Sequence, residues 1–274
     1  YLKSEGHTVQ RLVRRLPVSP DEIQWDPTTG YVDTQALAGV DAVIHLAGVG
    51  VGDKRWTKKY KAQILNSRLL GTEAIAKAVA EVKPQVFISA SAIGWYGESG
   101  NRAVVESDRV GDDFLAAVCR EWEAAADLAL GVRTVKLRTG LVLDPTGGAL
   151  GKMLPIFKFG LGGKLGSGKQ WWSWITLHDV IRAITFALEH PIEGPINLTS
   201  PNPVTNQEFT AALARAMRRP ALFPAPAIAL KIVLGGFSSE VLGSKKVIPQ
   251  KLIDAGFTWD YPHVTSALDV LIEN

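Results

Sequence analysis

Several apolar runs along the chain have the length and composition of strands in a buried sheet. The clearest run, Val40–Leu46, is followed at once by a loop of small residues, Ala47–Gly52. Near-continuous apolar runs of this kind are typical of parallel strands that are covered on both faces in α/β proteins. We therefore predict strands here and at Thr8–Val13, Val86–Ser91, Val132–Leu143 and Pro195–Thr199.

Helical patterns alternate with these strands. The longest runs from Thr57 to Val82, with Ile64 and Leu69 on its apolar face. Further helices are predicted at Asp112–Leu130 and Val180–Glu189, from the capping box Thr205–Glu208 to Arg218, and at Ala227–Leu234, Pro249–Ala255 and Pro262–Ile272. The alternation predicts the α/β class, as a Rossmann-like doubly wound parallel sheet with a small, mainly helical C-terminal lobe. We place the nucleotide-binding part in residues 1–150 and the substrate lobe in 151–274, with 175–199 returning to the sheet.

The first residues, Tyr1–His7, have the pattern of the last turns of a helix, with Gly6 as its C-cap. A helix end followed by the Thr8–Val13 strand is the second half of a βαβ unit, so we expect its first strand and glycine-rich turn upstream. The printed sequence has no G-x-x-G-x-x-G at the position of such a phosphate cradle. Arg14 and Arg15 follow the strand, where arginine accommodates the 2′-phosphate of NADP. The pair therefore predicts NADP, and the alternative is two surface charges.

A serine lies at the tip of one predicted central strand. Next to a nicotinamide, the hydroxyl of Ser91 can bind a substrate carbonyl or hydroxyl, although strand-end serines are also common as turn formers. Farther along, the glycine-rich segment Gly160–Ile175 holds three tryptophans within four residues. They indicate either a pocket wall for a flat or sugar-like ligand or ordinary core packing. The segment is not a Walker A motif, because Gly168-Lys169 is followed by Gln170.

Three stretches taken together resemble the extended short-chain dehydrogenases/reductases. They are His45–Gly48, Ser89–Gly97 and Gly166–Val180. The chain is most similar to the epimerase family within the NAD-dependent epimerase/dehydratase group, because Lys246–Leu252 and Ala255–Trp259 resemble its C-terminal domain of unknown function. The likeness covers essentially the whole chain, and the motifs are specific only as a set.

This resemblance implies a Rossmann-like fold that binds NADP. The cofactor residues that it implies are Arg14 and Arg15 at the adenosine phosphate, Leu46, Ala47 and Gly48 after the Val40–Leu46 strand, Gln63 and Arg68 on the long helix, and Ala90 and Val142 on later strands. The substrate residues that we infer with it are Lys169, Gln170 and Trp172.

The chain departs from the family at the catalytic pair Tyr-x-x-x-Lys. In the usual mechanism this tyrosine is the acid/base and the lysine lowers its pKa, but Leu115 and Cys119 stand at the matching positions. Ser91 matches the catalytic serine, and Tyr96 is near enough to substitute for the tyrosine. We expect an NADP-dependent oxidoreductase or epimerase that acts on a small hydroxyl or carbonyl substrate, such as a nucleotide sugar. The alternative is a non-catalytic NADP-binding regulator or redox sensor, linked to cell division.

Charge and cysteine content narrow the possible functions and the compartment of the protein. The 274 residues carry a net charge of +3, and their basic clusters are scattered, which favours solvated helix faces over a nucleic-acid site. The single cysteine, Cys119, excludes an internal disulfide and fits a reducing compartment. No signal peptide opens the chain, so we expect a cytoplasmic protein. The histidines have no metal-ligand spacing, and we expect no metal.

The longest apolar stretch is Ala221–Leu234. It contains Pro224, Pro226 and Lys231, so we do not interpret it as a membrane span. We expect a small-molecule substrate and no nucleic-acid or membrane partner. By analogy with extended family members, a homodimer would form through paired helices, here Ala62–Ala80 and Phe114–Leu130.

Overall fold

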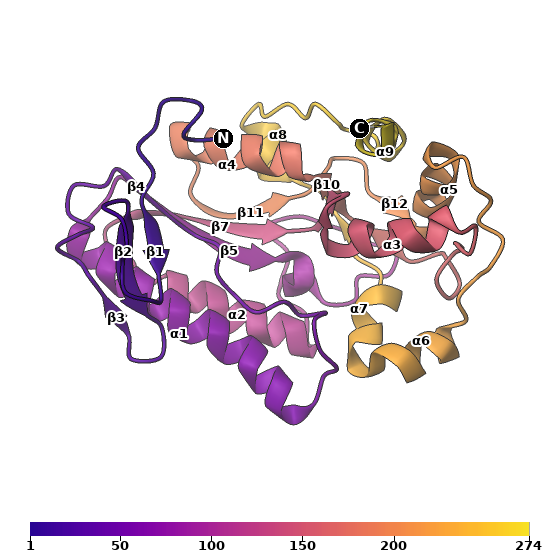
Figure 1. Cartoon of the computed structure of the whole chain (residues 1–274), viewed down its shortest axis with the longest axis horizontal. Helices are drawn as coiled ribbons and strands as arrows, with labels where there is room; N and C mark the ends of the chain where they lie inside the picture. Colours follow the sequence, from indigo (N-terminus) through magenta and orange to yellow (C-terminus); the bar gives the residue numbers. More distant parts are fainter. Residues whose placement is uncertain (274) are drawn as a thin grey trace.

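The computed structural model describes residues 1–273, and its centre is a four-stranded parallel sheet (Figure 1). The strand order is β11-β7-β5-β4, and each neighbouring pair is parallel. The strands are β4 (Ala42–His45), β5 (Val86–Ala92), β7 (Arg133–Thr139) and β11 (Gly194–Leu198). The parallel sheet predicted from the apolar runs is confirmed.

Helices cover both faces of this sheet, which makes it doubly wound (Figure 1). One face packs on the first two long helices and the other on two later ones. They are α1 (Lys58–Val82) and α2 (Phe114–Ala126), then α4 (Leu177–Glu189) and α8 (Gln250–Asp254). Phe87 belongs to the core under α1 and α2, whereas Ile88 belongs to the core under α4 and α8. Successive residues of β5 therefore face opposite helix layers, as the strand pleat requires.

A second, smaller sheet precedes α1 in the chain. It has the order β1-β2-β3, with β1 (Arg11–Val13), β2 (Glu22–Asp26) and β3 (Tyr31–Val32). The strand predicted at Thr8–Val13 is thus only its last three residues. The helix end predicted at the start is instead a set of hydrogen-bonded turns, although Gly6 does have the positive φ, 89°, of a C-cap.

Local signals explain where the elements begin and end. Thr57 caps α1 by accepting a hydrogen bond from the N–H of Tyr60, and α1 ends at Lys83, which has φ 56°. The single strand predicted at Val132–Leu143 is wrong. It divides at Gly140, where a Cβ would lie 2.5 Å from the carbonyl oxygen of Ser173. Because another backbone segment crosses so closely there, the chain leaves the sheet as β8 (Leu141–Asp144), which pairs with β10.

The C-terminal lobe is mainly helical, as predicted, and has its own core around Leu150, Phe157, Trp174 and Phe209. Its helices are α3 (Gly148–Lys158), α5 (Asn206–Ala216), α6 (Ala227–Leu234), η2 (Gly235–Phe237), α7 (Ser238–Leu242) and α9 (Val264–Glu273). Its strands are β9 (Trp171–Trp172), β10 (Trp174–Thr176), β12 (Val204–Thr205) and β13 (Lys246–Val247). Helix α3 was not predicted, because two glycines open it and Pro155 lies inside it.

The lobe is interleaved with the sheet domain. β13 pairs with β6 (Ala103–Val104), and β11 lies beside β7 in the central sheet. A single-turn helix, η1 (Ile93–Tyr96), follows β5. The limits 1–150 and 151–274 stay a prediction. Within residues 1–273, no helix combines the length and the apolar character that crossing a membrane requires.

Candidate cofactor site and buried polar network

The loop after β4 is open to solvent. Leu46, Ala47 and Gly48 are all exposed at the carboxyl end of this strand. Arg68 of α1 supports the loop, because its guanidinium donates hydrogen bonds to the carbonyl oxygens of Val49 at 3.0 Å and of Ile64 at 3.2 Å. The loop therefore presents backbone and small side chains next to a cation.

The charge on Arg68 is not neutralised by a carboxylate among the residues described. Its guanidinium lies over the ring of Trp122, 4.8 Å from the centroid, and burial lowers its pKa. A half-buried guanidinium that bonds only carbonyl oxygens can still pair with an anion. Together with the small residues of the neighbouring loop, it fits the phosphate end of a dinucleotide.

The two arginines after β1 have different environments. Arg15 makes a two-point ion pair with the buried carboxylate of Glu22, at 2.6 and 2.7 Å. The hydrogen bond from Arg15 lowers the pKa of Glu22. Arg14 is exposed and has no carboxylate partner among the described residues, so it is the freer of the two to receive a phosphate. Arg15 was also predicted to bind the 2′-phosphate of NADP, but its guanidinium is already occupied by Glu22.

Ser91 points to the α2 side of β5, where it is 3% exposed. Its hydroxyl donates to Glu123 Oε1 at 2.7 Å. Ala90, the next residue toward the start of β5, faces the opposite side and is half-buried. The hydroxyl at this strand end is thus engaged inside the protein.

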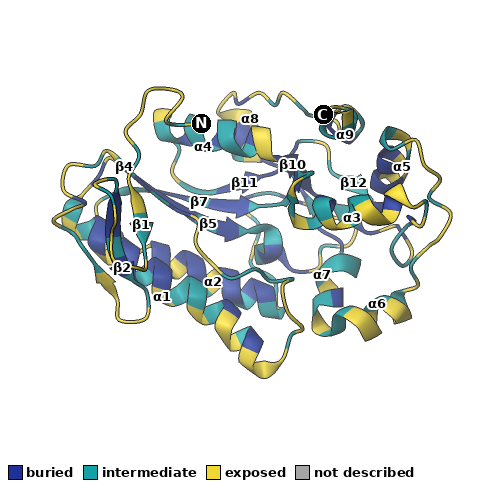
Figure 2. Ribbon diagram, in the orientation of Figure 1, coloured by how far each residue is buried: buried dark blue, intermediate teal, exposed yellow. Residues whose placement is uncertain are grey.

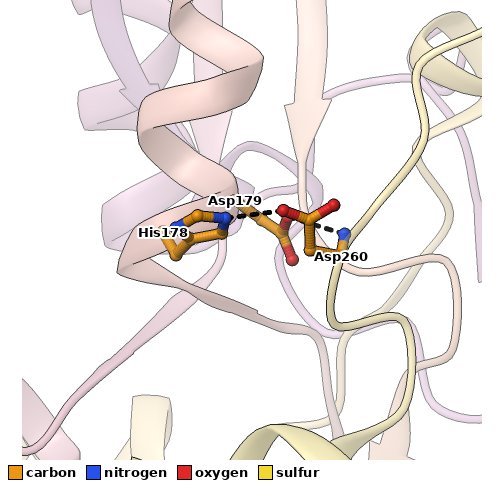
Figure 3. Close-up of side chains that lie close together, drawn as sticks. All are labelled: His178, Asp179 and Asp260. Carbon is orange, nitrogen blue, oxygen red and sulfur yellow. Dashed lines mark hydrogen bonds and ion pairs between the residues drawn. The ribbon is translucent and has the colours of Figure 1, made fainter. Parts of the chain in front are cut away.

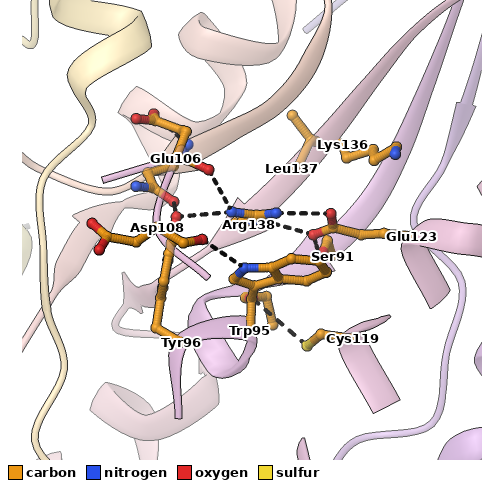
Figure 4. Close-up of polar contacts among 12 residues, drawn as sticks. Ser91, Trp95, Tyr96, Glu106, Asp108, Cys119, Glu123, Lys136, Leu137 and Arg138 are labelled. Atoms are coloured by element: carbon orange, nitrogen blue, oxygen red, sulfur yellow. Dashed lines mark hydrogen bonds and ion pairs between the residues drawn. The ribbon is translucent and has the colours of Figure 1, made fainter. Parts of the chain in front are cut away.

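Tyr96 belongs to the same buried network, which centres on Arg138 (Figure 4). Arg138 of β7 donates to both carboxylate oxygens of Glu123, at 2.8 and 3.0 Å. It also donates to the Tyr96 hydroxyl at 3.1 Å, and that hydroxyl donates to Asn197 Oδ1 at 2.6 Å. Burial raises the pKa of Tyr96 to about 12. The fold thus links Ser91 and Tyr96 in one network, through Glu123 and Arg138.

Glu123, Arg138 and Asn197 were not predicted as site residues. The available signal was a charged residue within a buried, otherwise apolar helix or strand, because such a charge must find a partner. A second buried carboxylate, Glu106, accepts from the backbone N–H of Asn197 at 2.9 Å. The side chains of Arg138 and Glu123 are 3% and 5% exposed, so their ion pair lies away from solvent.

The positions that replace the family's Tyr and Lys lie beneath η1. A Cβ at Gly94 would contact Leu115 at 3.3 Å and the Cys119 sulfur at 3.4 Å, so η1 packs directly on these two side chains. Burial raises the pKa of the Cys119 thiol to about 12. Neither side chain supplies an acid or base at neutral pH.

The remaining predicted residues lie apart from that network. Gln63 is exposed on α1, and Val142 is half-buried on β8. In the lobe, Lys169 is exposed, whereas Gln170 is buried and donates to the carbonyl oxygen of Leu165 at 2.9 Å. Trp172 packs on Phe209, with ring centroids 5.2 Å apart. This contact agrees with core packing, the alternative to a pocket wall, for that tryptophan.

One cluster has the residue types of a metal site but is already tied together (Figure 3). His178 Nε2 lies 2.7 Å from Asp260 Oδ2, next to the buried Asp179. Arg182 contacts Asp179 at 3.1 Å and Asp260 at 3.0 Å, and Asp179 also accepts from the N–H groups of Asp260 and Tyr261. These bonds fasten the segment before α9 to the start of α4.

Two cavities open on other surfaces. One, of about 370 Å³, lies in the lobe between Lys164, Gln207, Thr210 and Leu222. The other, of about 180 Å³, lies between α4 and the segment at Phe257. Neither is lined by Ser91 or Tyr96.

Comparison with known proteins agrees with this architecture. Residues 1–199 match the NAD dependent epimerase/dehydratase family, and residues 225–271 match a domain of unknown function, DUF1731. An epimerase family protein of Mycobacterium leprae is 43% identical over 271 residues, which cover 97% of this chain and 88% of that protein. The chloroplastic SDR39U1 homologue of Arabidopsis thaliana is 40% identical and aligns with 99% of this chain and 82% of its own length.

A solved structure extends the likeness to three dimensions. The human epimerase family protein SDR39U1, whose crystal structure was determined with NADPH, superposes with a TM-score of 0.91 at 33% identity, over 100% of this chain and 93% of that one. This similarity agrees with the sheet, the lobe and their order along the chain. The chain therefore belongs to the NAD dependent epimerase/dehydratase family, with a DUF1731 domain at its C-terminal end.

Proposed function

We propose that this chain binds NADP(H) and uses it to reduce or oxidise a small molecule that has a carbonyl or hydroxyl group, such as a nucleotide sugar. The observation that supports this most is the open loop after β4, where Ala47 and Gly48 lie next to the unneutralised cation of Arg68. The human relative solved with NADPH supports the choice of cofactor. When bound, NADPH would supply a hydride.

The residues of this chain would hold the cofactor in two places. Ala47 and Gly48 lack side chains beyond Cβ, so a flat ligand can approach their backbone, and Arg68 would face a phosphate oxygen. Arg14, exposed after β1, would receive the 2′-phosphate that distinguishes NADP from NAD. Arg15 would assist through its neighbouring charge while it holds Glu22.

Ser91 and Tyr96 would act by positioning. Their hydroxyls are committed to Glu123, Arg138 and Asn197, and both residues are 3% exposed. The network fixes the end of β5 and the start of η1. Because both hydroxyls are engaged, water would supply the proton when a carbonyl is reduced and would take it up when a hydroxyl is oxidised.

The test of cofactor binding is titration calorimetry with NADPH and NADH. We expect NADPH to bind more tightly than NADH, and Arg14→Gln to remove most of the difference. Arg68→Gln should weaken both ligands by about tenfold, the effect of losing one charge-assisted hydrogen bond. The control is Arg120→Gln on α2, an exposed arginine that pairs with Glu121. Equal affinities for the two cofactors, unchanged by Arg14→Gln, would contradict the proposal.

A second candidate function rests on a different observation. Leu115 and Cys119 supply no acid or base, and the buried Ser91 and Tyr96 do not replace them, which favours a regulator that binds NADPH without consuming it. Its signal would be cofactor binding itself, because the buried, high-pKa thiol of Cys119 is poorly suited to redox sensing. NADPH that binds but is not oxidised by any of a panel of aldehydes, ketones and nucleotide sugars would favour this function. Turnover of one of them would favour the enzyme.

A further inference from the structure

Two long stretches of the C-terminal lobe contain no acidic residue. The first lies between Asp144 and Asp179, and the second between Glu208 and Glu240. They contain eight basic residues: Lys152, Lys158, Lys164, Lys169, Arg215, Arg218, Arg219 and Lys231. Among the ion pairs of residues 1–273, only Arg215 of this set has an acidic partner, Asp269. The stretches therefore carry a concentrated positive charge that the net charge of +3 conceals.

The two stretches lie side by side. The N–H of Phe223 donates to the carbonyl oxygen of Gly162 at 3.1 Å, and that of Ala225 to Lys164 at 2.9 Å. The Arg219 side chain donates to the carbonyl oxygen of Lys158 at 3.2 Å. The end of α3 and the segment 219–225 are thus neighbours, and that segment leads directly into α6.

Large apolar side chains are exposed on this surface. We name it the basic apolar face and define it by Phe159, Leu161, Leu222, Phe223, Ile228 and Ile232, which are 57–78% exposed. The last two lie four residues apart on α6 and therefore share one face of that helix. None of the eight residues of α6 is buried, although all of them except Lys231 are apolar (Figure 2).

Exposed apolar side chains with basic residues beside them, such as Lys158 next to Phe159 and Lys231 next to Ile232, indicate a docking surface. A second copy of the chain fits poorly, because a two-fold interface would place this face against itself and oppose like charges. An anionic lipid surface fits both features, since lysine and arginine meet its headgroups while the apolar side chains enter the boundary with the acyl chains. An eight-residue helix is about 12 Å long and cannot cross a hydrocarbon layer of about 30 Å.

We propose that the basic apolar face docks on an anionic lipid bilayer, with α6 lying in the interface and not spanning it. No membrane partner was predicted from the sequence, because Ala221–Leu234 cannot span a bilayer. Peripheral docking needs no span, and this same stretch supplies the exposed side chains of α6. The face includes none of the residues proposed to bind NADP(H), so docking and cofactor binding can be tested separately.

The experiment is co-sedimentation of the full chain with vesicles of phosphatidylcholine alone and of equal parts phosphatidylcholine and phosphatidylglycerol. We expect binding to the anionic vesicles only, and weaker binding as salt is raised. The double variant Ile228→Asn/Ile232→Asn should lower the partition coefficient by about tenfold or more, because it removes two apolar side chains from the interface. Lys158→Gln/Lys231→Gln should lower it and reduce its salt dependence.

Matched controls come from the sheet domain. Leu130 and Val18 are 71% and 79% exposed, so Leu130→Asn and Val18→Asn remove exposed apolar side chains outside the face. Both should leave vesicle binding unchanged, and circular dichroism checks that every variant is folded. The proposal is overturned by no binding to anionic vesicles, by equal binding to neutral ones, or by an equal loss in the controls. Self-association that the Ile228→Asn/Ile232→Asn pair abolishes would also overturn it, in favour of a second copy.

Discussion

The buried ion pair between Glu123 and Arg138 is the residue-level feature with the largest expected effect on stability. The partners lie 2.8 Å apart at Nε and Oε1 and are almost fully excluded from solvent. Glu123→Gln keeps the shape of the side chain but leaves the guanidinium buried without a counter-charge. We expect a loss of about 3–5 kcal/mol in the free energy of unfolding. Urea denaturation followed by circular dichroism measures it.

The control is Glu121→Gln, two residues earlier on α2. Glu121 pairs with Arg120 at 3.1 Å, but the two side chains are 47% and 57% exposed, so this pair is worth about 0–1 kcal/mol. Similar losses in the two variants would mean that the interior pair is solvated in solution, which would refute the buried network.

His45 at the end of β4 makes stability depend on pH. Its Nε2 is buried without a hydrogen-bond partner, its ring lies 5.9 Å from that of Trp25, and burial lowers its pKa from 6.5 to about 4. Between these two values the unfolded chain binds a proton that the folded chain does not. The free energy of unfolding therefore falls as the pH falls through this window, and this histidine accounts for about 2 kcal/mol between about pH 7 and about pH 5.

The variant His45→Leu should flatten that part of the pH profile. Urea denaturation of the wild type and the variant at several pH values isolates the difference, because the acidic groups contribute equally to both. His7→Leu, which removes an exposed histidine, is the matched control and should keep the wild-type slope. An unchanged slope in His45→Leu would show that the ring is accessible to water.

At the scale of elements, the sequence predicts what local chemistry determines. Thr57 and Lys83-Pro84 delimit α1, and the Thr205–Glu208 capping box opens α5, where both of its hydrogen bonds are present. The break within the strand predicted at Val132–Leu143 depends instead on a distant contact, and it was not predicted. The division between β7 and β8 follows from a backbone crossing at Gly140, and the glycine itself was the available signal, because a glycine inside a strand pattern marks a bulge or a close backbone approach.

Because of the crossing at Gly140, we expect that even alanine is poorly tolerated at this position. A Cβ there would lie 2.5 Å from the Ser173 carbonyl oxygen and 2.8 Å from Thr199 Cγ2. Gly140→Ala must move a backbone segment, and we expect it to cost about 2–3 kcal/mol in thermal or urea denaturation. Gly71→Ala, inside α1, is the contrast: its Cβ would make ordinary contacts of 3.6 Å or more, and alanine favours the helix. Equal effects of the two changes would argue against the close crossing.

For the molecule as a whole, the sequence predicted which residues lie at the end of β5, but not that they are buried or what they bind. Ser91 and Tyr96 were predicted as catalytic residues, and in the structure both belong to one buried hydrogen-bond network. Their burial could not be predicted, because it depends on Glu123 and Arg138, which come from a helix and a strand farther along the chain. The same limit holds for the basic apolar face, whose two stretches are adjacent only after folding.

The two lobes should unfold together, because their backbones interlock. The N–H of Ser244 donates to Glu98 Oε2 at 2.9 Å, the N–H of Lys246 donates to the Ser99 hydroxyl at 3.1 Å, and the Asn197 amide of β11 donates to the carbonyl oxygen of Ile248 at 2.9 Å. A ligand that binds only the folded sheet domain should therefore stabilise the lobe as well.

If the proposed function is correct, NADPH is a ligand that binds only the folded sheet domain. At a concentration of about 100 times its dissociation constant it should add about 2.7 kcal/mol to the free energy of unfolding. Scanning calorimetry should then show one transition that moves upward as a whole, since the lobe cannot separate while β13 remains paired with β6. Two transitions, of which NADPH moves only the first, would mean that the lobe folds independently and that the interlocking contacts contribute little.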